Sequence, residues 1–145
     1  MDYAKKYGNY YTVGSIYKLK FKDKEFDTAI VSEVIEHLDN PDKAMEELKR
    51  ISKKYIIITV PYKEKLIREV CPHCLNKFYR SGHIQYFDLK RIEEMINNHK
   101  LEIVKVKKIA YYPFINFPLP IAIIVNKILA MMDKTTYIAV LCEKK

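Results

Sequence analysis

The sequence predicts one α/β domain built on a doubly wound, mostly parallel sheet. Two apolar, β-branched runs carry this prediction, Phe26 to Val31 and Tyr55 to Val60, because strands buried on both faces of a parallel sheet have this composition. A helical pattern lies between them, from Pro41 to about Lys53. A strand, a helix and a second strand in this order form a βαβ unit with a right-handed parallel crossover.

The helix in this unit has a clear start signal. Asn40 can cap it with its side-chain oxygen, and Pro41 suits the first helical position, where its missing N–H would be unpaired in any case. Four apolar residues then recur at helical spacing, namely Ala44, Met45, Leu48 and Ile51.

The second half of the chain predicts further helices and strands. An irregular stretch runs from Cys71 to Phe87, after which Asp88 caps a second helix. Leu101 to Ala110 alternates apolar and charged residues, as a half-exposed strand does. Thr135 to Cys142 predicts a closing strand.

An aromatic and proline-rich segment, Tyr111 to Pro120, precedes an apolar segment, Ile121 to Met132. Together, residues 111–132 could form a hydrophobic lid over a binding site or touch a membrane surface. We favour a buried core helix for Ile121 to Met132, because about a dozen apolar positions are too few to span a membrane.

The composition fits a single globular domain over residues 1–145. Hydrophobic residues make up 49% and charged residues 30% of the chain, which excludes the class of disordered proteins with low hydrophobicity. No segment reaches the roughly 18 apolar residues of a membrane-spanning helix, and the start lacks the apolar core of a signal peptide. We expect a cytoplasmic protein, and the abundance of Lys, Ile, Tyr and Glu favours a heat-loving source.

The net charge of +8 arises from 26 Lys and Arg against 18 Asp and Glu. A basic balance attracts nucleic acid. The lysines are scattered, however, and are not interleaved with aromatic residues and glycines as in proteins that bind single strands. We expect solvated basic faces, and nucleic-acid binding is a weaker alternative.

Two loops lie where a ligand is expected. In doubly wound sheets ligands bind beyond the carboxyl ends of the strands. Gly14 to Ile16 follows a short β-prone run, Tyr10 to Val13, and Ser32 to His37 follows the predicted strand Phe26 to Val31. These two loops are therefore the default site.

A series of short motifs resembles one family along almost the whole chain. Gly14-Ser15, Phe26-Asp27 and Glu36-His37-Leu38 occur in the order found in the type 11-like class I S-adenosylmethionine-dependent methyltransferases. Thr59-Val60-Pro61 and Gly82-His83 continue the similarity. Each motif is weak alone, whereas the set is specific. The resemblance implies a Rossmann-like fold.

The resemblance also implies a site for S-adenosylmethionine. In the family, the loop after the third strand lines the adenine and the loop after the fourth lines the methionine portion. This places the cofactor against Gly14, Ser15, Ile16, Ser32, Glu33 and Val34. The family has an acidic residue where this chain has Ser15. A hydroxyl accepts a hydrogen bond from the adenine amino group less strongly than a carboxylate does, so we expect weaker adenine binding here.

The amino-terminal half of the family's cofactor site has no counterpart in this sequence. Its Gly-rich turn would precede residue 2, and the three glycines of the chain form no G-x-G pattern. The resemblance therefore implies an incomplete, amino-terminally truncated class I methyltransferase fold. The strand from Phe26 to Val31 would then have an apolar edge. We expect a truncated chain, or one that a second copy or a partner chain completes.

The activity that the resemblance implies is methyl transfer to an unidentified small molecule or macromolecule, by direct displacement at the methyl carbon. Glu36 and His37 are candidate catalytic residues, because an imidazole titrates near neutral pH and a carboxylate can position it. Methyl transfer depends mainly on proximity and orientation. A structural hydrogen-bonding role for His37 is therefore the favoured alternative.

Cys71 and Cys74 form a C-x-x-C, and His83 follows at a spacing compatible with tetrahedral zinc. The odd count of three cysteines argues against a disulfide framework. A single C-x-x-C is half a zinc site, so a metal-free loop is an equal alternative. Zinc at these residues would be structural. A non-catalytic, zinc-stapled interaction module is the main alternative to an enzyme.

Overall fold

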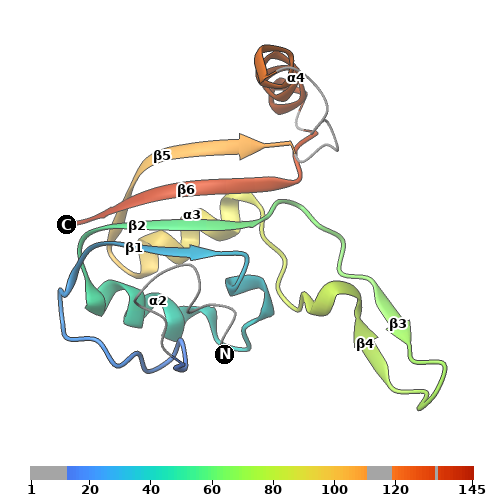
Figure 1. The fold of residues 1–145 in the computed structure, drawn as a ribbon, viewed down its shortest axis with the longest axis horizontal. Helices are drawn as coiled ribbons and strands as arrows, with labels where there is room; N and C mark the ends of the chain where they lie inside the picture. Colours follow the sequence, from blue (N-terminus) through green and yellow to red (C-terminus); the bar gives the residue numbers. More distant parts are fainter. Residues whose placement is uncertain (1–12, 111–118, 133) are drawn as a thin grey trace.

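The computed structural model describes residues 13–110, 119–132 and 134–145. It contains a four-stranded sheet in the order β1-β2-β6-β5 and a separate hairpin of β3 and β4 (Figure 1). In chain order the elements are β1 (Phe26–Ser32), η1 (Ile35–His37), α2 (Pro41–Ile51), β2 (Ser52–Pro61), β3 (Arg68–Val70), β4 (Lys77–Tyr79), η2 (Arg80–Gly82), α3 (Leu89–Asn98), β5 (Leu101–Ile109), α4 (Leu119–Met131) and β6 (Tyr137–Lys144).

The predicted βαβ unit is confirmed. β1 pairs with β2 in parallel, and α2 forms the crossover between them. Asn40 caps α2 by accepting a hydrogen bond from the Lys43 N–H at 3.0 Å. Asp88 caps α3 in the same way, through the Arg91 N–H at 2.8 Å. Each such cap typically stabilises a helix by about 1 kcal/mol.

The remaining strands join the sheet in antiparallel orientation. β6 lies between β2 and β5 and runs antiparallel to both. The Rossmann-like α/β fold class is confirmed, but in the main sheet of the described residues β1 and β2 are the one parallel pair. The alternation of apolar and charged residues in β5 is typical of an antiparallel strand that is exposed on one side.

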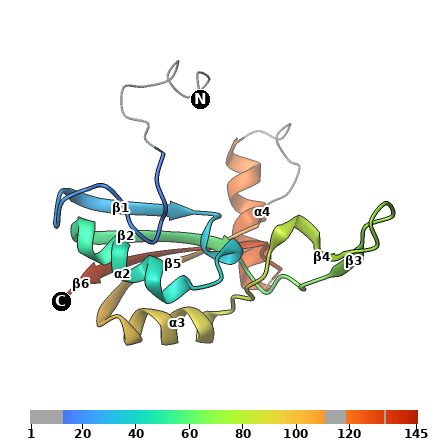
Figure 2. The same cartoon turned by 90° about the horizontal axis from the view of Figure 1, so that it is seen from below.

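The apolar composition of β1 and β2 predicts burial on both faces, but the part of the chain that the structure describes covers them on one face only. α2 and α3 lie against the same side of the sheet (Figure 2). Ala29 and Val31 of β1 are buried, whereas Ile30 between them is 66% exposed. An apolar run shows that a strand can be covered on both faces, but the covering elements must also be present. In the described residues, α2 and α3 supply that cover on one side.

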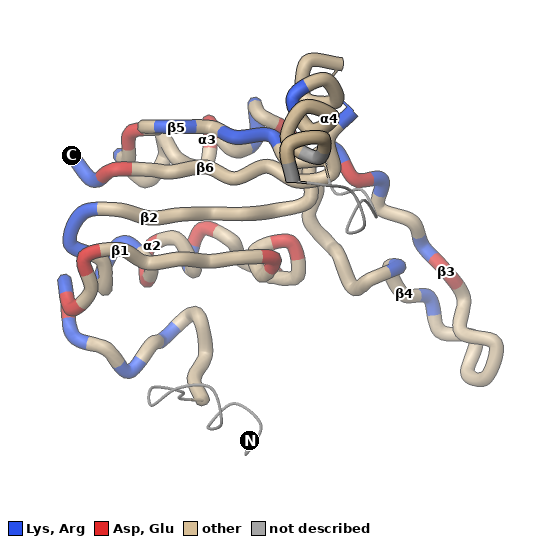
Figure 3. Tube along the Cα trace, turned by 45° about the horizontal axis from the view of Figure 1, so that its top comes forward, with Lys and Arg blue, Asp and Glu red and all other residues tan. Residues whose placement is uncertain are grey.

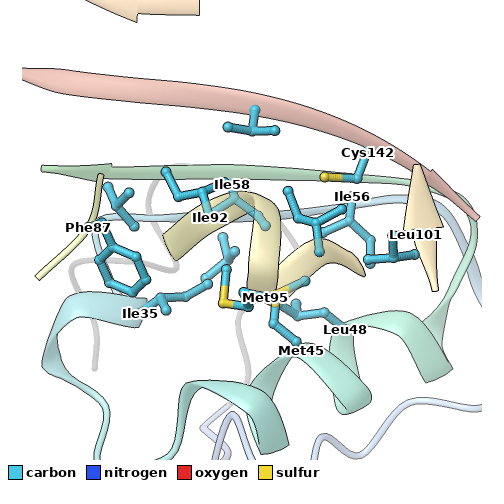
Figure 4. Close-up of a cluster of buried hydrophobic side chains, with 14 of the residues drawn as sticks. Ile35, Met45, Leu48, Ile56, Ile58, Phe87, Ile92, Met95, Leu101 and Cys142 are labelled. Carbon is cyan, nitrogen blue, oxygen red and sulfur yellow. The ribbon is translucent and has the colours of Figure 1, made fainter. Parts of the chain in front are cut away.

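The core lies between the sheet and these two helices (Figure 4). Ile56 and Ile58 of β2 and Cys142 of β6 meet Met45 of α2 and Met95 of α3. All five side chains are at most 4% exposed. Complete burial of a large apolar side chain stabilises a protein by roughly 1.5–3 kcal/mol. This packing holds β1 and β2 in place, and with them the loops at their carboxyl ends.

The stretch from Cys71 to Phe87 is more regular than its sequence indicates. β3 and β4 form an antiparallel hairpin that extends away from the main sheet (Figure 1). Cys71 and Cys74 lie in its turn. The Glu69 carboxylate accepts a hydrogen bond from Arg80 at 2.6 Å. Strands of three residues are too short to show a clear alternating pattern, so the sequence did not predict them.

α4 is exposed, so the interpretation of residues 121–132 as a core helix is wrong. Ile121, Ile123, Ile124 and Ile128 are 44–57% exposed, and α4 stands apart from α2 and α3 near one end of β5 and β6 (Figure 1). An apolar helix is buried only where another apolar surface can reach it. Residues 111–118 of the predicted lid lie outside the described residues. No helix in the described ranges is long and apolar enough to cross a membrane.

Candidate functional site

The carboxyl ends of β1 and β2 are joined by a network of hydrogen bonds. The Thr59 hydroxyl donates to the Glu33 carboxylate at 2.9 Å. Because a hydroxyl has one proton, the Ser32 hydroxyl must donate in its 2.7 Å contact with Thr59. The Glu33 N–H donates to the Thr59 carbonyl at 3.0 Å. Thr59, which the motifs did not single out as a site residue, therefore holds two predicted cofactor residues in place.

Glu33 adopts a left-handed backbone conformation, with φ of 53°. This region is uncommon for residues other than glycine and costs roughly 1–2 kcal/mol. It turns the chain out of β1 and toward η1. Strain of this kind persists where the surrounding contacts compensate for it, and it is concentrated at binding and catalytic sites.

A hollow of about 550 Å³ lies beside β1. Four of the predicted cofactor residues line it, namely Gly14, Ile16, Ser32 and Val34. Ser15 and Glu33 are not part of its wall. The Ser15 hydroxyl instead accepts a hydrogen bond from the Tyr17 N–H at 3.3 Å, within a local turn. The structure therefore brings both predicted loops to one hollow, although two of the six residues lie outside it.

Glu36, a candidate catalytic residue, is buried at the end of the same loop. Its side chain is 1% exposed, and neither carboxylate oxygen has a hydrogen-bond partner. Removal from water raises the pKa of the Glu36 carboxyl above its ordinary value, and the nearby Glu33 carboxylate acts in the same direction. The backbone of Glu36 is well held, since its carbonyl accepts hydrogen bonds from the N–H groups of Ile84 and Gln85.

His37 is the second candidate catalytic residue. Its ring faces that of His83, which lies in the segment after the hairpin. The centres of the two rings are 4.7 Å apart. Nδ1 of His37 lies 3.1 Å from the Gly82 carbonyl oxygen, and Nδ1 of His83 contacts the Glu64 carboxylate. The structural role predicted for His37 is thus visible as a hydrogen bond across 45 residues of sequence.

The turn at Ser81 and Gly82 presents this carbonyl to His37. Both residues have left-handed backbone conformations, with φ of 61° and 70°. A Cβ atom at Gly82 would lie 3.4 Å from Nδ1 of His37. Glycine therefore suits this position both in conformation and in the space that it leaves for the imidazole.

The predicted zinc site requires His83 to lie close to Cys71 and Cys74, and the structure does not bring these three residues together. Within the described part of the chain, Glu36, His37 and His83 form the one group of three potential metal-ligating side chains whose ligand atoms converge. The two cysteines lie in the hairpin turn, where N–H groups of Cys74 and His73 lower the pKa of the Cys71 thiol. The C-x-x-C remains half a site, and His83 belongs to a different cluster.

In sequence the chain is similar to proteins described as methyltransferases. A family model described as a methyltransferase domain matches residues 2–58. A Schizosaccharomyces pombe protein described as an uncharacterized methyltransferase is 46% identical over 43 residues, 30% of this chain and 16% of that protein. An uncharacterized protein of Methanocaldococcus jannaschii is 30% identical over 91 residues, 60% of this chain and 43% of that protein. The chain thus matches less than half the length of either curated relative.

Solved structures share the fold. A Thermotoga maritima methyltransferase, described as a possible histamine N-methyltransferase, has a TM-score of 0.64 and 16% identity over 99% of this chain and 68% of its own. A Burkholderia thailandensis 1,6-didemethyltoxoflavin-N1-methyltransferase, solved with S-adenosylhomocysteine, has a TM-score of 0.62 and 12% identity over 99% and 55%. The resemblance to the class I methyltransferases is confirmed.

The residues that the methyltransferase family model matches include one part of the site and not the other. Residues 2–58 contain both predicted loops, Gly14 to Ile16 and Ser32 to His37, and end one residue before Thr59. Gly82 and His83 lie beyond the match. All the residues that line the hollow beside β1 therefore lie within the match, whereas the group of Glu36, His37 and His83 includes a residue beyond it.

Proposed function

We propose that this domain takes part in S-adenosylmethionine-dependent methyl transfer, with the cofactor in the hollow beside β1. One observation carries the proposal. The residues that the family resemblance assigns to the cofactor come from two separate loops, and four of them line the same hollow. The hollow runs along β1 from Phe26 to Ser32 and so reaches the carboxyl end of this parallel strand, where ligands bind in folds of this class.

The chemistry of the hollow fits such a cofactor. Phe21, Phe26 and Ile30 contribute apolar walls, which suit the faces of an adenine ring. Ser32 adds a hydroxyl that is already oriented by Thr59. When bound, S-adenosylmethionine supplies a methyl group on a sulfonium, ready for displacement. The protein's part is to orient the reactants, because proximity and alignment account for most of the rate in such a displacement.

The free edge of β1 bears on this proposal. β1 pairs with β2 alone in the described residues, and Phe26 and Ile30 are exposed on it. An unpaired apolar strand invites association. We propose that a second copy or a partner chain covers this edge in the assembled protein and completes the cofactor site.

The charge distribution does not favour the nucleic-acid alternative. Lys and Arg recur along nearly every described segment, with Asp and Glu among them (Figure 3). Several are paired, as in the contacts of Arg50 with Glu47 at 2.7 Å and of Lys53 with Asp27 at 2.8 Å. A nucleic-acid site would need unpaired basic residues concentrated on one surface.

A single substitution tests the position of the cofactor. Ser32→Trp places a large ring at the wall of the hollow, and Val104→Trp places the same ring on the exposed face of β5 as a control. We expect S-adenosylhomocysteine to raise the melting temperature of the wild-type chain and of Val104→Trp but not of Ser32→Trp, because a ligand stabilises the state that binds it. An equal shift in both variants would place the cofactor elsewhere.

A further inference from the structure

The cluster of Glu36, His37 and His83 has the composition and spacing of a metal site. One ligand atom from each residue lies within 4.8 Å of the other two. We propose that these three side chains bind a divalent first-row transition-metal ion. The proposal rests on the geometry of the cluster and does not depend on cofactor binding.

The state of the Glu36 carboxylate is the strongest argument. A carboxylate removed from water is costly unless it is hydrogen-bonded or coordinates a metal. Both oxygens of Glu36 lack a hydrogen-bond partner, and the side chain is 1% exposed. A bound cation would satisfy both the charge and the lone pairs.

The contacts at Nδ1 leave Nε2 of both imidazoles available as a metal ligand. The Gly82 carbonyl can only accept, so Nδ1 of His37 carries the proton in that contact. The Glu64 carboxylate holds Nδ1 of His83 in the same way. Nε2 of each neutral ring then has a free lone pair. A carbonyl or carboxylate on the second ring nitrogen is the usual arrangement around metal-binding histidines.

The spacing of the ligand atoms leaves room for an ion between them. Nε2 of His37 lies 4.0 Å from Oε1 of Glu36, which is too far for a hydrogen bond between them. Two ligand atoms that are each about 2.1 Å from one ion can be up to about 4.2 Å apart. Small movements of the exposed His37 side chain would therefore close the site.

The ligand set indicates which ions fit and what else could bind. Two imidazoles and one carboxylate suit Zn²⁺, Fe²⁺, Co²⁺ or Mn²⁺ better than Ca²⁺ or Mg²⁺, which prefer oxygen ligands. Three protein ligands leave at least one position open. His83 and Glu64 also line a hollow of about 410 Å³.

Cobalt binding by the whole chain tests the proposal. The Cys71→Ser/Cys74→Ser double variant serves as the background, because the hairpin thiols would also bind Co²⁺. We expect visible absorption bands without thiolate character and one Co²⁺ per chain by calorimetry. Glu36→Gln and His83→Asn should each weaken binding at least about 10-fold, as loss of a ligand does more than loss of a supporting residue.

Matched controls keep the outcome clear. Glu93→Gln on the exposed face of α3 and His73→Asn in the hairpin turn should bind Co²⁺ as the background does. Circular dichroism checks that every variant is folded. Absence of binding at millimolar Co²⁺, or unchanged affinity in either Glu36→Gln or His83→Asn, would overturn the proposal. A separate titration with S-adenosylmethionine in the presence of chelator reports on cofactor binding alone. A failure of metal binding can therefore be distinguished from a failure of cofactor binding.

Discussion

At the scale of single residues, the site combines groups that are stabilising with groups that are not. Ser32, Thr59 and Glu33 satisfy one another through short hydrogen bonds. Glu36 is buried on the same loop without a hydrogen-bond partner for either oxygen. Residues that lower stability without an evident structural gain are common at functional sites, where ligand binding compensates for them. Glu36 is therefore the residue whose substitution separates stability from function.

The metal-free chain should become more stable when Glu36 is replaced by Gln. The substitution removes a buried charge and keeps the shape of the side chain, so we expect a gain of roughly 1–3 kcal/mol in the free energy of unfolding. Urea denaturation in chelator measures the effect. Glu93→Gln, on the surface, should change the free energy of unfolding by less than about 0.5 kcal/mol. A loss of stability in Glu36→Gln would mean that the carboxylate has a partner in the folded chain.

Cys142 should behave as a core thiol. Burial raises its pKa to about 12 from an ordinary value of 9.0. Between these two values the unfolded chain releases a proton that the folded chain keeps, so the stability contribution of this thiol falls as the pH rises from 9.0. Wild type should therefore lose stability relative to Cys142→Ala over that range, measured by urea denaturation. In the folded protein Cys142 should also resist alkylation, and labelling as fast as that of Cys74 would contradict its burial.

At the scale of elements, the sequence predicts those features whose signals are local. The caps at Asn40 and Asp88 and the helical spacing in α2 and α3 lie within a few residues of the structure that they determine. The pairing of His37 with Gly82 and His83 joins segments 45 residues apart, and no local pattern contains it. The exposed faces of β1 and α4 were missed for the same reason, since burial depends on which other elements pack there.

The exposed apolar side of α4 should tolerate a charge. Ile124 is 57% exposed, so Ile124→Lys should change the free energy of unfolding by less than about 0.5 kcal/mol and should reduce self-association through the apolar helix. Ile96→Lys in α3 is the contrasting variant, because Ile96 is completely buried and a charge there should unfold the chain. Thermal denaturation and light scattering measure both effects. Severe destabilisation by Ile124→Lys would show that α4 packs against a surface in solution.

At the scale of the whole molecule, the main sheet of the described residues has two edge strands, β1 and β5. Within the described ranges β1 pairs with β2 alone and β5 with β6 alone, and the hollow that contains the predicted cofactor residues lies beside β1. This strand forms one wall of the hollow. The shape of the complete site therefore depends on what covers the edge of β1. Cofactor binding and assembly are expected to be coupled, because a ligand that binds across an interface favours the assembled state.

Calorimetric titration of the chain with S-adenosylmethionine tests the central claim most directly. The protein concentration should span the range over which light scattering shows self-association, if any occurs. We predict heat with a stoichiometry of one site per chain or one site per assembled dimer, and loss of that heat in Ser32→Trp. The absence of binding heat at millimolar cofactor, at every protein concentration, would contradict the assignment of a methyltransferase cofactor site to this chain.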